Sequence, residues 1–258
     1  MVTGVWPALA SLAAGADAAG ASVAAGWLAG AAVGVAVELL GPYFAERRTS
    51  GTPWHPHHIA ERYGLLVIIA LGEVVLGTIL TISAGVEQSG WTLEAGLLAF
   101  GGTALAFGLW WTYFLVPFGD LLVIDRPRPF VFGYLHPFVF AAVVATGAGL
   151  HVAAQAVAHH GEVAPVFAMQ TVVIPVLVFE LMIFVIYSLM TREIDRFHFW
   201  LFAGCAATLA IAVGAVALGA SLGVGLILVA CSPAVIVVGF ETVGWRHMDE
   251  MLARARAR

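Results

Sequence analysis

Seven long apolar runs constrain the fold of this chain more than any other feature of its sequence. Each run reaches or exceeds the roughly 20 residues that a helix needs to cross a bilayer. Hydrophobic residues make up 61% of the chain and charged residues only 10%, whereas about a quarter of a soluble domain is charged. This composition excludes a soluble enzyme, a disordered regulator and a nucleic-acid-binding domain. The runs are Ser22–Phe44, Arg62–Ala84, Leu93–Val116, Phe132–Ala158, Val166–Met190, Phe199–Gly219 and Leu222–Trp245.

We therefore predict an all-α integral membrane protein, with a bundle of seven transmembrane helices over residues 22–245. Residues 1–21 are also apolar but are interrupted by Gly15, Asp17 and Gly20. We expect them to form a remnant or interfacial segment. Residues 246–258 are predicted to be a basic cytoplasmic tail.

The placement of arginine predicts the orientation of the bundle. Every second connection and the tail carry arginine, and the alternate connections carry none. This is the positive-inside pattern, so the amino terminus is expected outside and the carboxyl terminus in the cytoplasm. The arginines are Arg47, Arg48, Arg62, Arg126, Arg128, Arg192, Arg196, Arg246, Arg254, Arg256 and Arg258.

The residue types present argue against a cofactor or a metal. The chain has no lysine, so neither retinal nor pyridoxal phosphate can be bound as a Schiff base. Cys205 and Cys231 stand alone in apolar runs. The histidines of the segment His55–His58 lack a second converging set of ligands, which a metal site needs. No cofactor, no metal site and no nucleic-acid partner are therefore expected.

Ionisable residues inside the apolar runs are the main candidates for function. Each costs roughly 2.5–3.5 kcal/mol at the centre of a membrane helix, so such residues usually have a role. Glu73 and Glu180 are predicted near the midplane, and Glu38 lies closer to the cytoplasmic end of its run. They are candidates for proton or cation sites. The alternative is that these acids are neutral or capped and only hold helices together.

The second run presents a polar stripe that begins at its cytoplasmic end. At 100° per residue, His58 and Arg62 lie 40° apart, and Arg62 and Glu73 lie about 20° apart on one helix face. Glu61 is close enough on the helix to pair near the same end. The stripe predicts a cytoplasmic mouth formed by His58, Glu61 and Arg62, which leads toward Glu73. The alternative is a positively charged anchor followed by one structural carboxylate.

Aromatic residues gather near the end of the third run. Trp110, Trp111 and Tyr113 lie close to the expected cytoplasmic interface. Tryptophan and tyrosine are enriched at membrane–water interfaces, so we predict that these three side chains form part of an aromatic belt. The alternative is that they stack against a substrate.

Three segments resemble the bacterial low temperature requirement protein A family. Residues 58–73, HIAERYGLLVIIALGE, are similar to its signature H-x-x-E-R-F/Y-G-L followed by apolar residues and L-G-E. Residues 105–114, LAFGLWWTYF, and residues 133–150, GYLHPFVFAAVVATGAGL, also resemble it. The resemblance implies a multispanning inner-membrane protein. It also implies that this chain lacks the usual amino-terminal region with the motif E-L-F-F-D-L-V-F, through a late start at Met1 or as a shortened paralogue.

The leading hypothesis is transport or ion and proton handling across the bacterial inner membrane, with an unknown small solute or ion as substrate. The alternative is a non-transporting scaffold or sensor in which the buried carboxylates join helices. No HExxH, GxSxG or DxD pattern within the predicted helices favours a membrane-embedded enzyme. The expected partners are the lipid bilayer and either a second copy of the chain or a protein that supplies the missing helices. A polar cavity shared by Glu73 and Glu180 would favour transport over the scaffold.

Overall fold

The computed structural model describes residues 54–124, 129–158, 162–192, 196–246 and 248, together with residues 27, 30, 33–38, 40–42, 44 and 45. The chain divides into two compact units, Met1–Pro53 and Trp54–Arg258. In the first unit, the described residues are helical and include an apolar stretch within Val33–Pro42. About half of the predicted span Ser22–Phe44 lies outside the described residues, as do the predicted segment 1–21 and most of the tail.

The second unit consists of helices, and no strand occurs in the parts of it that the structure describes. Six helices are long and apolar enough to cross a membrane, and the chain is a multi-helix membrane protein. The elements are α3 (Pro56–Ser89), α4 (Leu93–Leu115), α5 (Phe118–Ile124), α6 (Pro129–Ala158), α7 (Pro165–Thr191), α8 (Arg196–Ala217), α9 (Leu222–Gly239) and the π-helical turn η1 (Phe240–Gly244).

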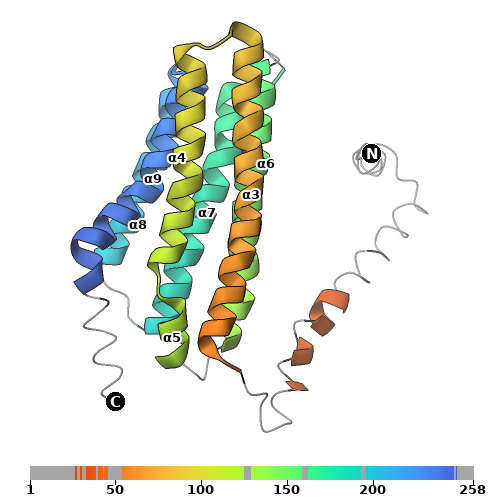
Figure 1. The fold of residues 1–258 in the computed structure, drawn as a ribbon, viewed down its shortest axis with the longest axis vertical. Helices are drawn as coiled ribbons and strands as arrows, with labels where there is room; N and C mark the ends of the chain where they lie inside the picture. Colours follow the sequence, from red (N-terminus) through yellow and green to blue (C-terminus); the bar gives the residue numbers. More distant parts are fainter. Residues whose placement is uncertain are drawn as a thin grey trace. The chain divides into compact units, whose positions relative to one another are not determined.

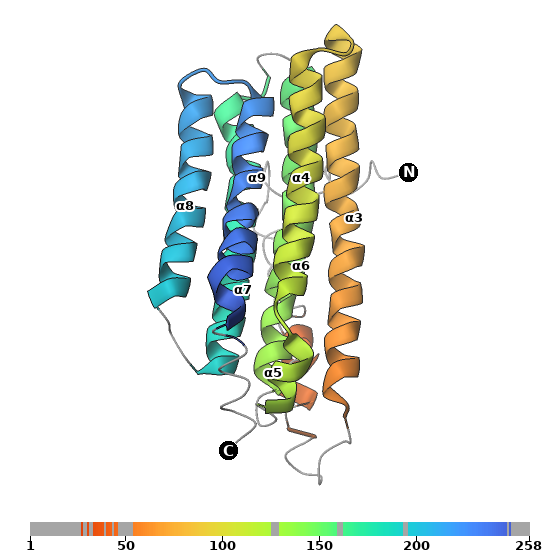
Figure 2. The same cartoon turned by 60° about the vertical axis from the view of Figure 1, so that its left-hand side comes forward.

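The six long helices of this unit close into a ring. Helix α3 packs beside α4 and α6, α6 beside α7, α7 beside α8, α8 beside α9, and α9 beside α4. Figures 1 and 2 show the helices running alternately up and down along the bundle. Helix α7 also contacts α9 across the ring, and the short α5 packs against α3 and α7. The interior of the ring holds most of the buried core.

Six of the seven predicted spans are confirmed as helices long enough to cross a membrane. Helix α3 begins at Pro56, earlier than the predicted Arg62, and α5 was not predicted. The break before α5 has a local cause. Val116 is extended, with φ −83° and ψ 119°, and a residue before proline avoids the helical region because of a clash with the proline ring.

The sharp turns at one end of the bundle follow from capping residues and glycines. The side chains of Thr92 and Ser221 accept hydrogen bonds from backbone N–H groups in the first turns of α4 and α9. Gly90 and Gly219 follow α3 and α8 with φ angles of 72° and 97°, a region that favours glycine. The two helix pairs are thereby joined by short connections.

Glycines also let neighbouring helices approach closely. A Cβ atom added to Gly101 in α4 would lie 2.9 Å from the Cβ atom of Leu226 in α9. A Cβ atom added to Gly77 in α3 would lie 2.6 Å from the carbonyl oxygen of Gly147 in α6. Small residues at such contacts are typical of membrane helices, which associate through close packing.

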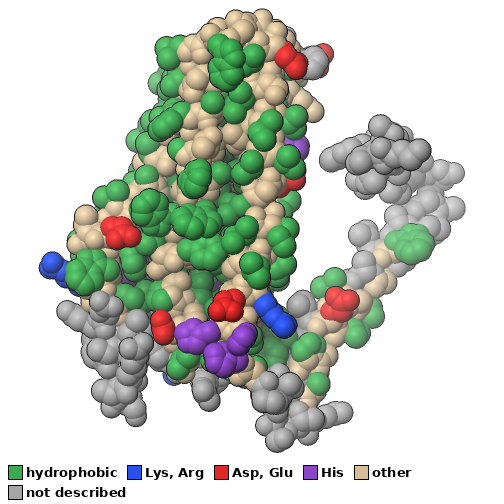
Figure 3. Space-filling model, in the orientation of Figure 1, with side chains coloured by type: hydrophobic (Ala, Val, Ile, Leu, Met, Phe, Trp, Pro, Cys, Tyr) green, Lys and Arg blue, Asp and Glu red, His purple; other side chains and the backbone are tan. Residues whose placement is uncertain are grey.

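The bundle is apolar on its sides and polar at its ends. Figure 3 shows hydrophobic side chains over much of the visible face and a group of histidine, acidic and arginine side chains toward one end. The described arginines of this unit, Arg62, Arg192, Arg196 and Arg246, all belong to helix termini at this same end. The described connections at the other end carry none. The alternation of arginine along the sequence is thus also an alternation in space.

Candidate functional site

Glu180 of α7 is the most deeply buried acidic residue that the structure describes, with no exposed surface. The hydroxyl oxygen of Ser232 in α9 lies 2.7 Å from one carboxyl oxygen of Glu180 and 2.9 Å from the other. The hydroxyl donates its hydrogen to the carboxyl group. Glu180 therefore joins α7 to α9 across the interior of the ring.

Helix α8 completes this buried centre. The thiol of Cys205 lies 3.5 Å from the carbonyl oxygen of Ser232, and the Ser232 hydroxyl oxygen lies 3.3 Å from the carbonyl oxygen of Cys205. Three helices thus meet at Glu180, Ser232 and Cys205. We call these three residues the Glu180 cluster.

The electrostatic environment of Glu180 is neutral. Among the described residues, its hydrogen-bond partner is a hydroxyl group, and no arginine or histidine forms an ion pair with it. A carboxylate that is buried without a positive partner is costly, and such a group normally takes up a proton or binds a cation instead. The Glu180 cluster can therefore hold a proton, or a small cation, on the carboxyl group.

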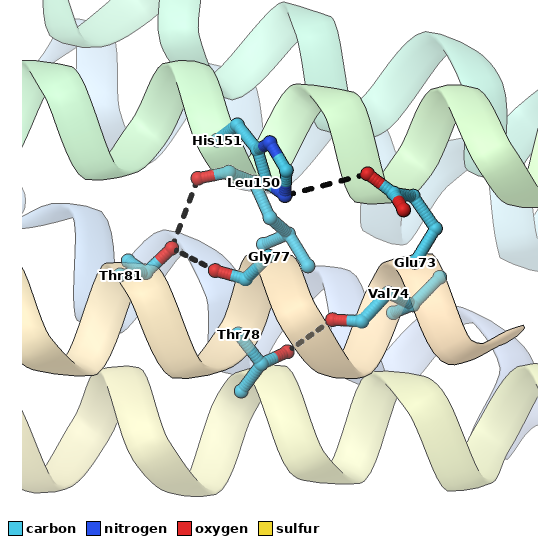
Figure 4. A network of polar contacts seen from close by, with 7 residues as sticks. All are labelled: Glu73, Val74, Gly77, Thr78, Thr81, Leu150 and His151. Carbon is cyan, nitrogen blue, oxygen red and sulfur yellow. Dashed lines mark hydrogen bonds and ion pairs between the residues drawn. The ribbon is translucent and has the colours of Figure 1, made fainter. Parts of the chain in front are cut away.

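Glu73 of α3 forms a second polar centre, with His151 of α6 (Figure 4). The Nε2 atom of His151 lies 3.5 Å from the Oε1 atom of Glu73, and both side chains are about one-third exposed, at 37% and 36%. This contact does not reach hydrogen-bond geometry, and Nε2 itself is buried without a hydrogen-bond partner in the described structure. The pair is thus close enough to exchange a proton through a small movement of either side chain.

The backbone around this pair is held by contacts between α3 and α6. The hydroxyl of Thr81 lies 2.8 Å from the carbonyl oxygen of Gly77 in its own helix and 2.9 Å from that of Leu150 in α6. Figure 4 shows these contacts beside the pair. Gly147 lies against the backbone of Glu73, where a Cβ atom would come within 2.6 Å. The position of the Glu73 side chain therefore depends on two small residues and one threonine.

The two central acids do not share one polar site. Glu73 lies between α3 and α6, whereas Glu180 lies among α7, α8 and α9, and no hydrogen bond or ion pair between described residues links them. Glu73 and Glu180 thus belong to separate polar centres in the membrane-spanning helices.

The predicted mouth residues lie in the first two turns of α3. The Nδ1 atom of His58 is 4.0 Å from the Oε2 atom of Glu61, and both side chains are well exposed. Arg62 is also exposed. These residues and Glu73 belong to one continuous helix. Glu38 belongs to the first unit, Met1–Pro53, and its role remains a prediction.

Sequence reasoning missed a third polar centre, at His136 of α6, which is fully buried. Its Nδ1 atom lies 2.7 Å from the carbonyl oxygen of Phe132, so this nitrogen carries the hydrogen and donates. The other nitrogen, Nε2, then accepts from the hydroxyl of Tyr113 at 3.1 Å. Aromatic rings surround the imidazole, from Tyr63, Tyr113, Phe118, Phe132 and Phe140.

The position of Tyr113 corrects one prediction. Trp110 and Trp111 are 42% and 47% exposed, as an aromatic belt requires, but Tyr113 is only 2% exposed. Its ring packs in the core and its hydroxyl binds His136. The sequence offered one overlooked signal, because a tyrosine within a buried helix needs a partner for its hydroxyl group.

The described residues contain no group of three or more His, Cys, Asp or Glu side chains that could hold a metal ion. The histidines at the start of α3 contact one another as rings, with centroids of His55 and His58 4.8 Å apart. The expectation that the chain has no metal site remains a prediction.

Comparison with known proteins identifies one family. The family model described as bacterial low temperature requirement A protein (LtrA) matches residues 1–233. No curated protein and no solved structure matches the chain.

Proposed function

The chain belongs to the bacterial low temperature requirement A family, whose model matches it over residues 1–233, and from this premise we propose that it carries protons or another small cation across the bacterial inner membrane. Glu180 is the proposed binding group. The family membership supports a membrane location and names no reaction. The proposal therefore depends on the polar groups of the helices themselves.

The observation that carries the proposal is the complete burial of Glu180 with a hydroxyl group as its partner. If helix association were its only role, a neutral amide or hydroxyl would serve without the cost of an ionisable group. A carboxyl group differs from these in one property, because it can release its proton and accept it again. Ser232 can donate to the charged form and can rotate to accept from the neutral form.

The Glu73–His151 pair supports a role in proton handling at a second depth in the bundle. The carboxyl group of Glu73 and the imidazole of His151 lie 3.5 Å apart, so a small movement of either side chain would bring them into hydrogen-bond contact. His58, Glu61 and Arg62 at the start of the same helix would form the polar mouth on the cytoplasmic side. In this proposal, Glu73 binds a proton between α3 and α6, and Glu180 binds a proton in the interior of the ring.

The test is a flux assay on purified protein in liposomes that contain a pH-sensitive dye. A potassium gradient with valinomycin sets the membrane potential, and external sodium is varied to separate proton from sodium movement. We expect the wild type to acidify or alkalinise the lumen according to the sign of the potential. Glu180→Gln should abolish this signal, because Gln keeps the size of the side chain but cannot titrate.

Glu87→Gln is the matched control, because Glu87 is exposed near the end of α3 and belongs to neither polar centre. It should retain the wild-type flux. A Glu180→Gln protein that conducts as well as the wild type would remove Glu180 from the mechanism. Glu73→Gln measured in parallel shows whether the second centre contributes to the same flux.

The alternative function is a membrane scaffold or sensor without transport. The separation of Glu73 from Glu180 favours it, because two isolated polar centres are also what helix-joining contacts would produce. Wild-type liposomes without any flux, together with a nearly silent Glu180→Gln substitution, would favour this alternative.

A further inference from the structure

We infer that a small cleft between α4, α7, α8 and α9 holds water and forms the proton access to Glu180 from the end of the bundle that carries the arginines. The inference rests on the proposed function for the destination of the proton, but the presence of water can be tested without it. The cleft has a volume of about 30 Å³. This is enough for one or two water molecules, since one occupies about 10–15 Å³ by this measure.

The cleft is lined mainly by apolar side chains, with a few polar groups among them. The lining includes Thr112 of α4, Tyr187 of α7 and His198 of α8. The rings of Tyr187 and His198 stack with their centroids 4.7 Å apart. Together with Thr112, these two side chains bring hydroxyl and imidazole groups to a cavity whose other described lining residues are apolar.

The hydroxyl of Thr112 is the observation that points to water. Thr112 has no exposed surface, and its Oγ1 atom has no hydrogen-bond partner in the described structure. Three other buried threonines of the bundle, Thr78, Thr81 and Thr146, donate to the carbonyl oxygen four residues earlier. Thr112 could make the same bond but does not. A buried hydroxyl without a protein partner usually binds an ordered water.

The walls of the cleft lead directly to the Glu180 cluster. In α7, Ile183 lies one turn from Glu180, and in α9, Ile236 lies one turn from Ser232. Both isoleucines line the cleft. Leu201 of α8 also lines it, one turn from Cys205. Residues three or four apart share a helix face, so each of the three helices that form the cluster also forms the cleft.

The lining of the cleft favours water over a metal cation as its occupant. The described residues that line the cleft include no carboxylate, whereas a metal cation prefers oxygen-rich coordination. A chain of one or two waters needs only occasional polar contacts and can carry a proton. Ile183 and Ile236 line the cleft and lie one turn from Glu180 and Ser232, so in this inference they form the apolar step between the water and the Glu180 cluster.

An irregular segment also contributes to the lining of the cleft. Phe240, which lines the cleft, is the first residue of the π-helical turn η1. Single π-helical turns inside helices are frequent at functional sites. The change from the α-helix α9 to the π-helical turn η1 therefore occurs beside the cleft.

The test is hydroxyl-radical footprinting of the wild-type protein in nanodiscs, because radicals made from bound water oxidise adjacent side chains. Met248 and Tyr187 line the cleft and are 3% and 9% exposed, whereas Met190 and Tyr113, at 4% and 2%, are not among its lining residues. We expect oxidation of Met248 and Tyr187 to exceed that of Met190 and Tyr113 several-fold. Equal oxidation within both pairs would overturn the inference.

Thr112→Val provides the second measurement. Valine has nearly the same shape as threonine but cannot bind water, so oxidation of Tyr187 should fall several-fold in this variant while that of Tyr113 stays constant. In the liposome assay, Thr112→Val should also slow a flux that depends on Glu180. If footprinting shows water but the wild type has no flux, the cleft is hydrated and the proposed function is wrong. If flux depends on Glu180 but the cleft is dry, the access route is wrong.

Discussion

Gly147 of α6 lies directly against the peptide group of Glu73 in α3. A Cβ atom at Gly147 would come within 2.6 Å of both the carbonyl carbon and the carbonyl oxygen of Glu73. This distance is far inside van der Waals contact, so the two helices could not keep their spacing with any larger residue. The contact between Glu73 and His151 is formed beside this crossing.

We predict that Gly147→Ala separates α3 from α6 and weakens the bundle by about 1–3 kcal/mol, the scale of overpacking in a filled core. Gly72→Ala is the control on α3, because a Cβ atom there meets nothing within 4 Å. The measurement is reversible unfolding in mixed detergent micelles. Equal stability of the two variants would show that the crossing is not as tight as described.

Thr81 is expected to stabilise the same crossing through its hydroxyl. Thr81→Val should lower the free energy of unfolding by about 0.6–1.7 kcal/mol, the range measured for hydrogen bonds between membrane helices. Thr146→Val is the matched control, because Thr146 is equally buried and its hydroxyl, within the described part of the chain, bonds to Ala142 of its own helix and to no other helix. The control should cost less, and an equal or larger loss for Thr146→Val would contradict the role of the bond from Thr81 to α6.

Two substitutions of Glu180 separate its contribution to the stability of the bundle from its proposed role in proton transport. Glu180→Gln should leave the unfolding free energy close to that of the wild type, because an amide can still accept from Ser232. Glu180→Leu should lower it by about 0.6–2 kcal/mol, since the link from α7 to α9 is lost. A Gln variant as unstable as the Leu variant would mean that the carboxyl group itself is needed for folding.

Tyr113 and Tyr63 test the centre at His136. Tyr113→Phe removes the donor to Nε2 of His136 and should cost about 0.6–1.7 kcal/mol. Tyr63→Phe keeps the ring that packs on His136 and should cost less. Thermal unfolding of both variants in the same detergent gives the comparison. If Tyr63→Phe is the more damaging change, the hydrogen bond from Tyr113 is not what holds this centre.

The orientation of the bundle predicts the side on which reporters are found. A reporter fused after Arg258 should be cytoplasmic, and one inserted near His160 should be external, because arginine-rich ends remain inside. Alkaline phosphatase and a fluorescent protein, which are active on opposite sides of the inner membrane, provide complementary signals. Reversed signals at both positions would mean that the bundle has the opposite orientation. Signals from the same side at both positions would contradict the predicted number of spans between them.

The spans were predictable because their length and hydropathy are set by the bilayer. The inward face of each helix was not, because lipid and protein core are both apolar and periodicity does not separate them. Tyr113 was for this reason assigned to the surface beside Trp110 and Trp111, although it packs in the core. The depth of Glu180 indicated its burial, but its partner Ser232 comes from another helix and no spacing in the sequence relates the two.

The ring of helices also has a consequence for biosynthesis. Helix α3 has its most extensive packing with α6, and α4 with α9, so neither early helix meets its main neighbour until much later segments have been made. Glu94 at the start of α4 binds the backbone N–H of Gly223 in the first turn of α9, at 2.7 Å. The partners of Glu94 and of the α4 face around Gly101 both belong to α9. These groups of α4 therefore lack their partners until α9, the last of the six long helices, enters the membrane and closes the bundle.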